Sequence, residues 1–99
     1  MELKPCPKCG NKNLNANILF RDEPYQYSYG VLCEKCRFYM EYNPNIHIEN
    51  KQGGLPLILM ILPGIVIKKG RQTWNDIKPR KIKKYNKYVV NGGNLTIKC

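Results

Sequence analysis

Residues 4–13, KPCPKCGNKN, and residues 33–36, CEKC, decide how the first half of this chain folds. Each stretch places two cysteines two residues apart, a spacing at which one tight turn aims both sulfur atoms at a single metal ion. Pro7 fixes φ inside the first turn, and Gly10 permits the positive φ that points backbone N–H groups at the thiolates. The second turn has Arg37 where glycine is expected, so it requires either a strained residue or a shifted bend.

The four paired cysteines predict one structural Zn²⁺ ion. Zinc takes four soft or borderline ligands in tetrahedral geometry, and four thiolates leave no open position for water or substrate. The expected ligands are Cys6, Cys9, Cys33 and Cys36, with Cys99 left outside the shell. A redox role is less favoured, because a thioredoxin-like cysteine pair begins a helix in a βαβ frame and neither pair has that context.

The remaining chemistry of the sequence favours a binding protein over an enzyme. His47, the single histidine, lies between two isoleucines in a polar stretch and is expected at the surface rather than in the metal shell. We find no nucleophile beside a base and no tight acidic pair. The start, MELKPCPKCG, lacks the apolar stretch of a secretory signal, so we expect a cytoplasmic protein, in which paired cysteines bind metal rather than form disulfides.

Alternating apolar residues predict a small antiparallel sheet in residues 1–42. Residues 13–21, 25–33 and 37–42 each show a period of two, which is typical of strands with one buried face. The tyrosines at positions 25, 27 and 29 share one face, where packing is favoured over stacking on nucleobases. Two cysteine turns at one end of three antiparallel strands give a small, mostly-β zinc ribbon.

Residues 43–99 are expected to form a β-rich extension of the same compact domain. Residues 43–54 indicate a connector, and the apolar run 55–67, LPLILMILPGIVI, is interpreted as two buried or edge strands, since it contains two prolines and is too short for a membrane span. As an alternative, this run could form a dimer or partner-binding surface. A short helix is expected over 72–77, with Trp74 packed against the sheet, and a C-terminal hairpin around the turn NGGN.

Almost all of the net charge of +10 lies in the last third of the chain. Residues 1–67 carry seven Lys/Arg against six Asp/Glu, whereas residues 68–99 carry ten against one. This asymmetry indicates an anionic partner, although a solvated basic tail would have the same composition. The candidate partner-binding residues are Lys68, Lys69, Arg71, Lys78, Arg80, Lys81, Lys83, Lys84 and Lys87.

The stretches LKPCPKCGNKNL, VLCEKC and RQTWNDI together resemble the Lar-like restriction-alleviation proteins, small zinc ribbons of phages and prophages. The four cysteines match that family's zinc ligands, and Trp74 and Asn75 match its helix signature. The chain departs from the pattern at Arg37, in the apolar insertion 55–67 and in the basic C-terminal segment.

The resemblance implies a phage or mobile-element protein that blunts host nuclease immunity by direct binding. The expected partner is a host nuclease, either a restriction enzyme or a CRISPR effector, or its nucleic-acid complex. The alternative is a ribbon that binds nucleic acid itself, as an accessory protein in transcription or replication. The two functions differ in salt dependence, because binding to nucleic acid alone weakens steeply as salt is added.

Overall fold

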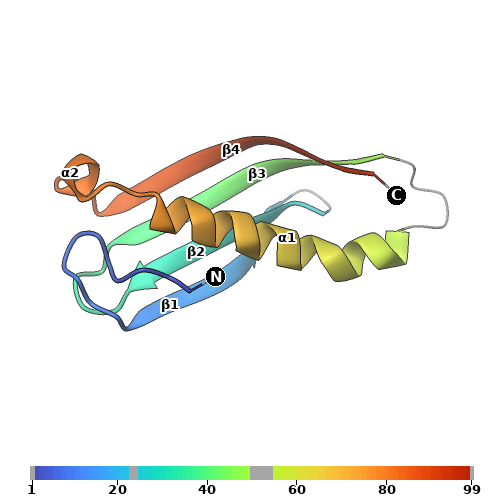
Figure 1. Ribbon diagram of the computed structural model, residues 1–99. Helices are drawn as coiled ribbons and strands as arrows, with labels where there is room; N and C mark the ends of the chain where they lie inside the picture. Colours follow the sequence, from blue (N-terminus) through green and yellow to red (C-terminus); the bar gives the residue numbers. More distant parts are fainter. Residues whose placement is uncertain (1, 23–24, 50–54, 99) are drawn as a thin grey trace.

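A computed structural model describes residues 2–22, 25–49 and 55–98 of the chain. It contains β1 (Leu14–Phe20), β2 (Tyr27–Cys33), β3 (Tyr39–Glu49), α1 (Leu55–Asn75), α2 (Pro79–Ile82) and β4 (Lys87–Lys98). The strands form one sheet in the order β1-β2-β3-β4, and α1 crosses one face of it (Figure 1). The molecule is therefore a mostly-β protein with two layers, and β3 crosses the expected boundary between the ribbon and its extension.

The antiparallel part of the sheet matches the alternation of the sequence. Leu14 pairs with Cys33 and Phe20 with Tyr27, so β1 and β2 form a hairpin, and β3 then runs antiparallel to β2. Both cysteine turns consequently lie at one end of the sheet (Figure 1). The predicted three-stranded antiparallel arrangement is confirmed.

The two layers meet in a core of aromatic and aliphatic side chains. Tyr29, Val31 and Met40 are buried on the face of the sheet that α1 covers. The ring of Tyr29 lies against Gly70 of α1, where a β-carbon would collide with it. Packing, not base stacking, therefore explains Tyr27 and Tyr29, both of which are buried.

The prediction of strands over residues 55–67 is wrong, because this run forms the first half of the 21-residue helix α1. Buried residues recur at every fourth position, at Ile58, Leu62, Val66, Gly70 and Trp74, which is the spacing of one helix face. The sequence hides this period, since apolar residues occupy every side of the helix in its first half. Of the short helix expected at 72–77, residues 72–75 are the last turn of α1, which ends at Asn75.

Both prolines fit the helix for identifiable reasons. Pro56 lies in the first turn, where backbone N–H groups have no intrahelical acceptor. Pro63 lies inside α1, and the packing of Leu62 and Val66 against the sheet offsets the hydrogen bond that it removes. Among the described residues, no helix has both the length and the apolar character needed to span a membrane.

The connector expected at 43–54 is also wrong over residues 43–49, which continue β3. The strand passes through Pro44, which has no N–H to donate, and the ladder with β4 shifts register between Asn43 and Asn45. On the edge of β3 that faces away from β4, the buried side chain of Gln26 satisfies the backbone of Ile46. Its Nε2 donates to Ile46 O at 2.9 Å, and Ile46 N donates to its Oε1 at 3.2 Å. Residues 50–54 of the expected connector lie outside the described residues.

The expected C-terminal hairpin is wrong as well, because Lys87–Lys98 form the single strand β4. This strand runs parallel to β3, and the turn-like sequence NGGN makes a bulge in which Asn91 pairs with Asn43 and Asn94 with Asn45. Gly93 has the positive φ of 68° expected of that sequence, but it bends the strand rather than reversing it. Parallel strands need a long crossover, and α1 supplies it.

Trp74 packs as predicted. It is 1% exposed, its ring centroid lies 5.8 Å from that of Phe38, and its Nε1 donates a hydrogen bond of 2.9 Å to Lys4 O. The neighbouring Asn75 accepts from Lys4 N at 2.8 Å and donates to Glu2 O at 2.9 Å. The end of α1 therefore holds the N-terminal segment that leads into the first cysteine turn.

We expect Trp74→Ala to lower the free energy of unfolding by about 3–5 kcal/mol, because it empties a fully buried site and orphans Lys4 O. Trp74→Phe keeps a ring beside Phe38 and should cost less. Chemical denaturation of the metal-loaded protein, followed by far-ultraviolet circular dichroism, measures both. Equal stability of the parent and Trp74→Ala would contradict this packing.

Candidate metal centre

The two cysteine turns have the same backbone hydrogen bonds. In the first turn, Cys6 N donates to Asn11 O at 2.9 Å and Gly10 N to Cys6 O at 2.8 Å. In the second, Cys33 N donates to Phe38 O at 2.9 Å and Arg37 N to Cys33 O at 3.0 Å. One local geometry is thus used twice, at the start of the chain and between β2 and β3.

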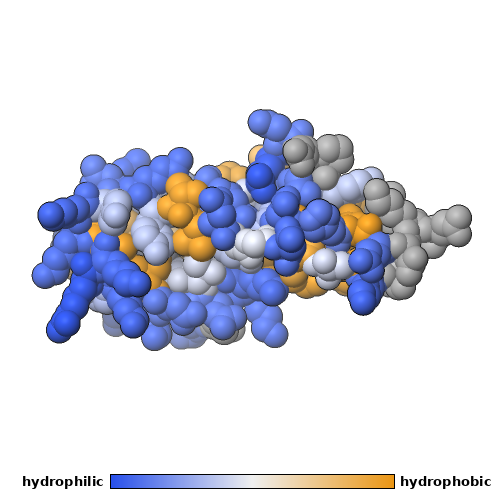
Figure 2. Space-filling view, turned by 90° about the horizontal axis from the view of Figure 1, so that it is seen from above, coloured by the Kyte–Doolittle hydropathy of each residue, from blue (hydrophilic) through white to orange (hydrophobic). Residues whose placement is uncertain are grey.

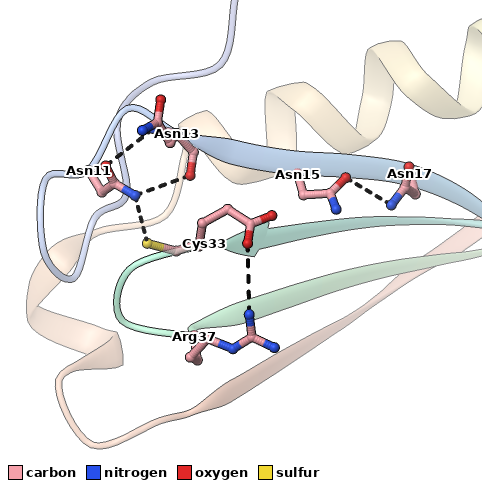
Figure 3. A network of polar contacts seen from close by, with 7 residues as sticks. Asn11, Asn13, Asn15, Asn17, Cys33 and Arg37 are labelled. Carbon is pink, nitrogen blue, oxygen red and sulfur yellow. Dashed lines mark hydrogen bonds and ion pairs between the residues drawn. The ribbon is translucent and has the colours of Figure 1, made fainter.

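Arg37 adopts the conformation that glycine has in the first turn. Its φ is 65°, against 79° at Gly10, so the second turn keeps its shape by straining a non-glycine residue. This was one of the two outcomes expected from the sequence. The guanidinium lies 3.8 Å from Glu34, but both side chains are largely exposed, so the ion pair offsets little of the strain (Figure 3).

The turns bring four sulfur atoms together. Their Sγ atoms all lie within 4.8 Å of one another, with 3.6 Å between Cys6 and Cys36 and 3.4 Å between Cys9 and Cys33. Metal–sulfur bonds of about 2.3 Å in a tetrahedron place sulfur atoms roughly 3.8 Å apart. The cluster therefore fits a single tetrahedral metal ion, as the cysteine spacing predicted.

Local environment gives the thiols different proton affinities. Burial raises the pKa of Cys6 to about 12, and it also raises the pKa of Cys36. Burial acts in the same direction on Cys33, but the backbone N–H groups of Cys36 and Lys35 point at its sulfur and lower its pKa to about 6. Of these three thiols, Cys33 therefore loses its proton most readily at neutral pH.

Asn11 supports the cluster in a way that sequence reasoning missed. Its Nδ2 lies 3.7 Å from Cys33 Sγ and 3.1 Å from Asn13 O, while its Oδ1 accepts from Asn13 N at 3.3 Å (Figure 3). Asparagine commonly bonds the nearby backbone in turns, and that was the available signal. Contact with a cysteine 22 positions away becomes evident only in the fold.

His47, the other candidate ligand that the structure describes, lies away from the cysteine cluster. His47 is exposed on β3 and pairs with Thr96, toward the end of the sheet opposite the cysteine turns. The cluster of potential metal ligands found among the described residues does not include His47. Cys99 lies outside the described residues.

The structure places most of the predicted basic residues beside the cysteine turns. Lys8 of the first turn donates through Nζ to Tyr85 O at 2.9 Å, and Tyr39 N, just after the second turn, donates to Asn86 O at 3.0 Å. The segment 78–87 therefore lies at the same end of the molecule as the cysteine turns. In Figure 2 this end is on the left, and its surface is mostly hydrophilic. Its exposed members are Lys78, Arg80, Lys81, Lys83, Lys84 and Lys87; Lys68 and Lys69 are exposed on α1, and Arg71 is half-buried.

We expect the purified protein to bind about one Zn²⁺ per chain, and Cys6→Ser or Cys33→Ser to abolish tight binding. Cys99→Ser is the matched control and should keep full metal content. Zinc affinity should fall as the pH is lowered, because Cys6 and Cys36, with their raised pKa values, must release protons on binding. Metal analysis and titration against a chromophoric chelator measure both effects; a folded parent without metal would contradict them.

The strain at Arg37 predicts that Arg37→Gly is more stable than Arg37→Ala by about 1 kcal/mol, because only glycine adopts positive φ without steric cost. Both variants lose the same guanidinium, so the comparison isolates the backbone. Thermal unfolding at saturating zinc measures the difference. An equal midpoint for the two variants would mean that the turn relaxes out of the left-handed conformation.

The chain was compared with known proteins at the levels of family, sequence and structure. No family model matches it, and no match was found among the curated proteins or the solved structures. The resemblance to the Lar-like proteins therefore stays a prediction, based on the cysteine turns and the Trp74–Asn75 pair.

Proposed function

We propose that Cys6, Cys9, Cys33 and Cys36 hold one structural Zn²⁺ and that the chain is a zinc ribbon with a helical crossover added to it. The sulfur separations and the matched turns support this assignment. A 99-residue chain buries a modest core, and structural zinc in small domains adds on the order of 10 kcal/mol. When bound, zinc would join the two turns covalently and leave no ligand position for catalysis.

We further propose that the protein acts by binding, through a basic end made of residues 78–87 and the two cysteine turns. The segment 78–87 contains six Lys/Arg and no acid. Four thiolates around Zn²⁺ carry a net charge of about −2, which these cations more than offset. Such a concentration of like charge is most stable when an anionic surface meets it.

The observation that carries the proposal is that this segment is fixed to the core. Ile82 of α2 is fully buried, although it is flanked by exposed lysines. A backbone hydrogen bond from Tyr39 N to Asn86 O and a side-chain hydrogen bond from Lys8 Nζ to Tyr85 O attach the rest of the segment to both cysteine turns. A solvated tail needs no such attachments, whereas a binding surface benefits from cations held in fixed positions.

The proposed partner is a host nuclease, a restriction enzyme or a CRISPR effector, that the protein inhibits without catalysis in the cytoplasm of the host cell. The Lar-like resemblance is the ground for this choice. Nucleases present acidic residues and nucleic acid together at their active sites, and a rigid basic surface complements both. The source would then be a phage or another mobile element.

A second candidate is direct binding of nucleic acid by the same basic end. The observation that favours it is the position of the basic segment beside a zinc ribbon, with Lys8 of the first turn joined to Tyr85. Affinity for DNA or RNA alone that falls steeply with salt would support this function. A complex that forms only with a nuclease, and survives nuclease digestion of the lysate, would support inhibition.

The apolar run retains a proposed role as a second surface. Leu59, Met60 and Ile61 are 40%, 78% and 44% exposed on the first half of α1, which carries no charged residue from position 55 to 67. Exposed apolar side chains that are adjacent in a helix are typical of dimer or partner contacts. This surface is the alternative if the basic end proves dispensable.

We expect the triple variant Lys81→Glu, Lys83→Glu, Lys84→Glu to keep its zinc and its fold, since all three side chains are exposed, and to lose function. The loss should appear mainly as slower association, because surface charges act on the on-rate. Lys98→Glu, at the far end of β4, is the charge-reversal control. The readouts are binding kinetics with the captured partner and protection of a phage from the host nuclease; full protection by the triple variant would transfer the role to Leu59, Met60 and Ile61.

A further inference from the structure

One face of the sheet is not covered by α1, and its side chains follow from the strand register. Residues that alternate with the buried ones point to this open face. They include Asn15 and Asn17 of β1, Gly30 of β2, Tyr39, Glu41 and Asn43 of β3, and Lys87, Val89 and Asn91 of β4, with Leu19 and Leu32 on the hairpin and His47 farther along β3. The face is therefore rich in amides, with the ring of Tyr39 near its cysteine end.

The hydroxyl end of the Tyr39 ring lies over Gly30. A β-carbon at Gly30 would come within 2.5 Å of the phenol oxygen, 2.9 Å of Cε1 and 3.0 Å of Cζ. The ring thus approaches the backbone at a distance that only glycine allows. The hydroxyl donates to Glu41 Oε1 at 3.0 Å, which helps to fix the position of the ring. Tyr39 is half-buried.

Lys87 of the neighbouring strand extends over this ring. Its Nζ is 5.7 Å from the Tyr39 ring centroid, and the residue is the last of the basic segment 78–87. The positive charge of the cysteine end therefore extends onto the open face at Tyr39. On the other side of the ring, the exposed Asn15 and Asn17 are joined by a hydrogen bond of 3.0 Å (Figure 3).

We infer that this face binds single-stranded nucleic acid, with one base stacked on Tyr39 and an adjoining phosphate at Lys87. A half-exposed ring, a neighbouring cation and surrounding amides form a combination that binds unpaired bases with little sequence preference. The flexible Lys87 side chain, which lies over the ring, would move aside to the phosphate as the base stacks. A duplex keeps its base faces stacked inside and cannot use the ring. The inference does not depend on the proposed nuclease partner, because it rests on Tyr39 and the open face and shares only Lys87 with the basic end.

Glu41 determines how a strand would lie. Its carboxylate accepts from Tyr39 and, at 3.2 Å, from Asn43 Nδ2, so a negative charge is fixed in the middle of the face. Phosphates are repelled from that position, whereas the amino group of a base can donate to the same carboxylate. The backbone of the strand would therefore follow the Lys87 side, with bases directed across β3.

The test is fluorescence anisotropy with labelled dT12 and U12 and with a labelled duplex of equal length, using the zinc-loaded protein. We expect both single strands to bind more tightly than the duplex. Tyr39→Leu should weaken single-strand binding by about tenfold, whereas Tyr39→Phe should stay within about threefold of the parent, because stacking needs the ring and not the hydroxyl. Phe20→Leu, which removes a 79% exposed ring elsewhere, should have no effect.

A second matched pair of variants tests how much the positive charge of Lys87 contributes to binding. Lys87→Ala should weaken binding and reduce the slope of log affinity against log salt by about one phosphate contact, while Lys98→Ala on the same strand should not. Tyr39→Leu binding with the parent's affinity would overturn the inference. So would a duplex that binds as tightly as the single strands, or single-strand binding that depends only on Lys81, Lys83 and Lys84.

Cross-linking tests the parent chain directly and does not rely on a folded variant. An oligonucleotide that carries 5-iodouracil stacks on aromatic side chains and forms a bond with them under near-ultraviolet light. We expect the modified peptide to contain Tyr39. Cross-linking confined to Tyr85, the exposed tyrosine of the basic segment, would place the strand on the cysteine end and overturn the inference.

Discussion

The parallel pairing of β3 with β4 is the constraint on which the rest of this structure depends. Since both strands start at the cysteine end, the chain must travel back along the sheet after β3 before β4 can begin. Helix α1 makes that return, and in doing so covers one face of the sheet and leaves the other open. The same path delivers residues 78–87 to the two cysteine turns. The positions of the four cysteines, the basic residues and the open face thus all follow from the parallel pairing of β3 with β4.

Local patterns were sufficient for the antiparallel hairpin and for the metal cluster. The apolar alternation of β1 and β2 marks the residues that face α1, and the two-residue spacing within each cysteine pair reflects a turn with two backbone hydrogen bonds. Trp74 was also predictable, because a large ring within a polar stretch needs a buried partner, and Phe38 provides it. These features depend on residues that lie within a few positions of one another, or, for Trp74, on the strong tendency of a large aromatic ring to be buried.

The helix and the parallel strand could not be predicted in the same way. In residues 55–67 apolar side chains surround the helix, so no period distinguishes Ile58 and Leu62, which face the sheet, from Met60, which does not. The sequence around Gly93 encodes a positive φ correctly, but whether the chain reverses or continues depends on a pairing partner some fifty positions earlier. Asn11 near Cys33 and Tyr39 over Gly30 are likewise products of the fold, since no local signal joins them.

The hydrogen bonds between the end of α1 and residues 2–4 affect how the protein would be degraded. Trp74 and Asn75 hold the segment that leads directly into Cys6, so the helix and the cysteine cluster share one short support. With an ion bound as proposed, its removal would free the first turn, and with it the segment on which the end of α1 rests. Chelation should therefore expose the core to proteases along the whole helix at once, so that the supply of metal in the cell would set the lifetime of the protein.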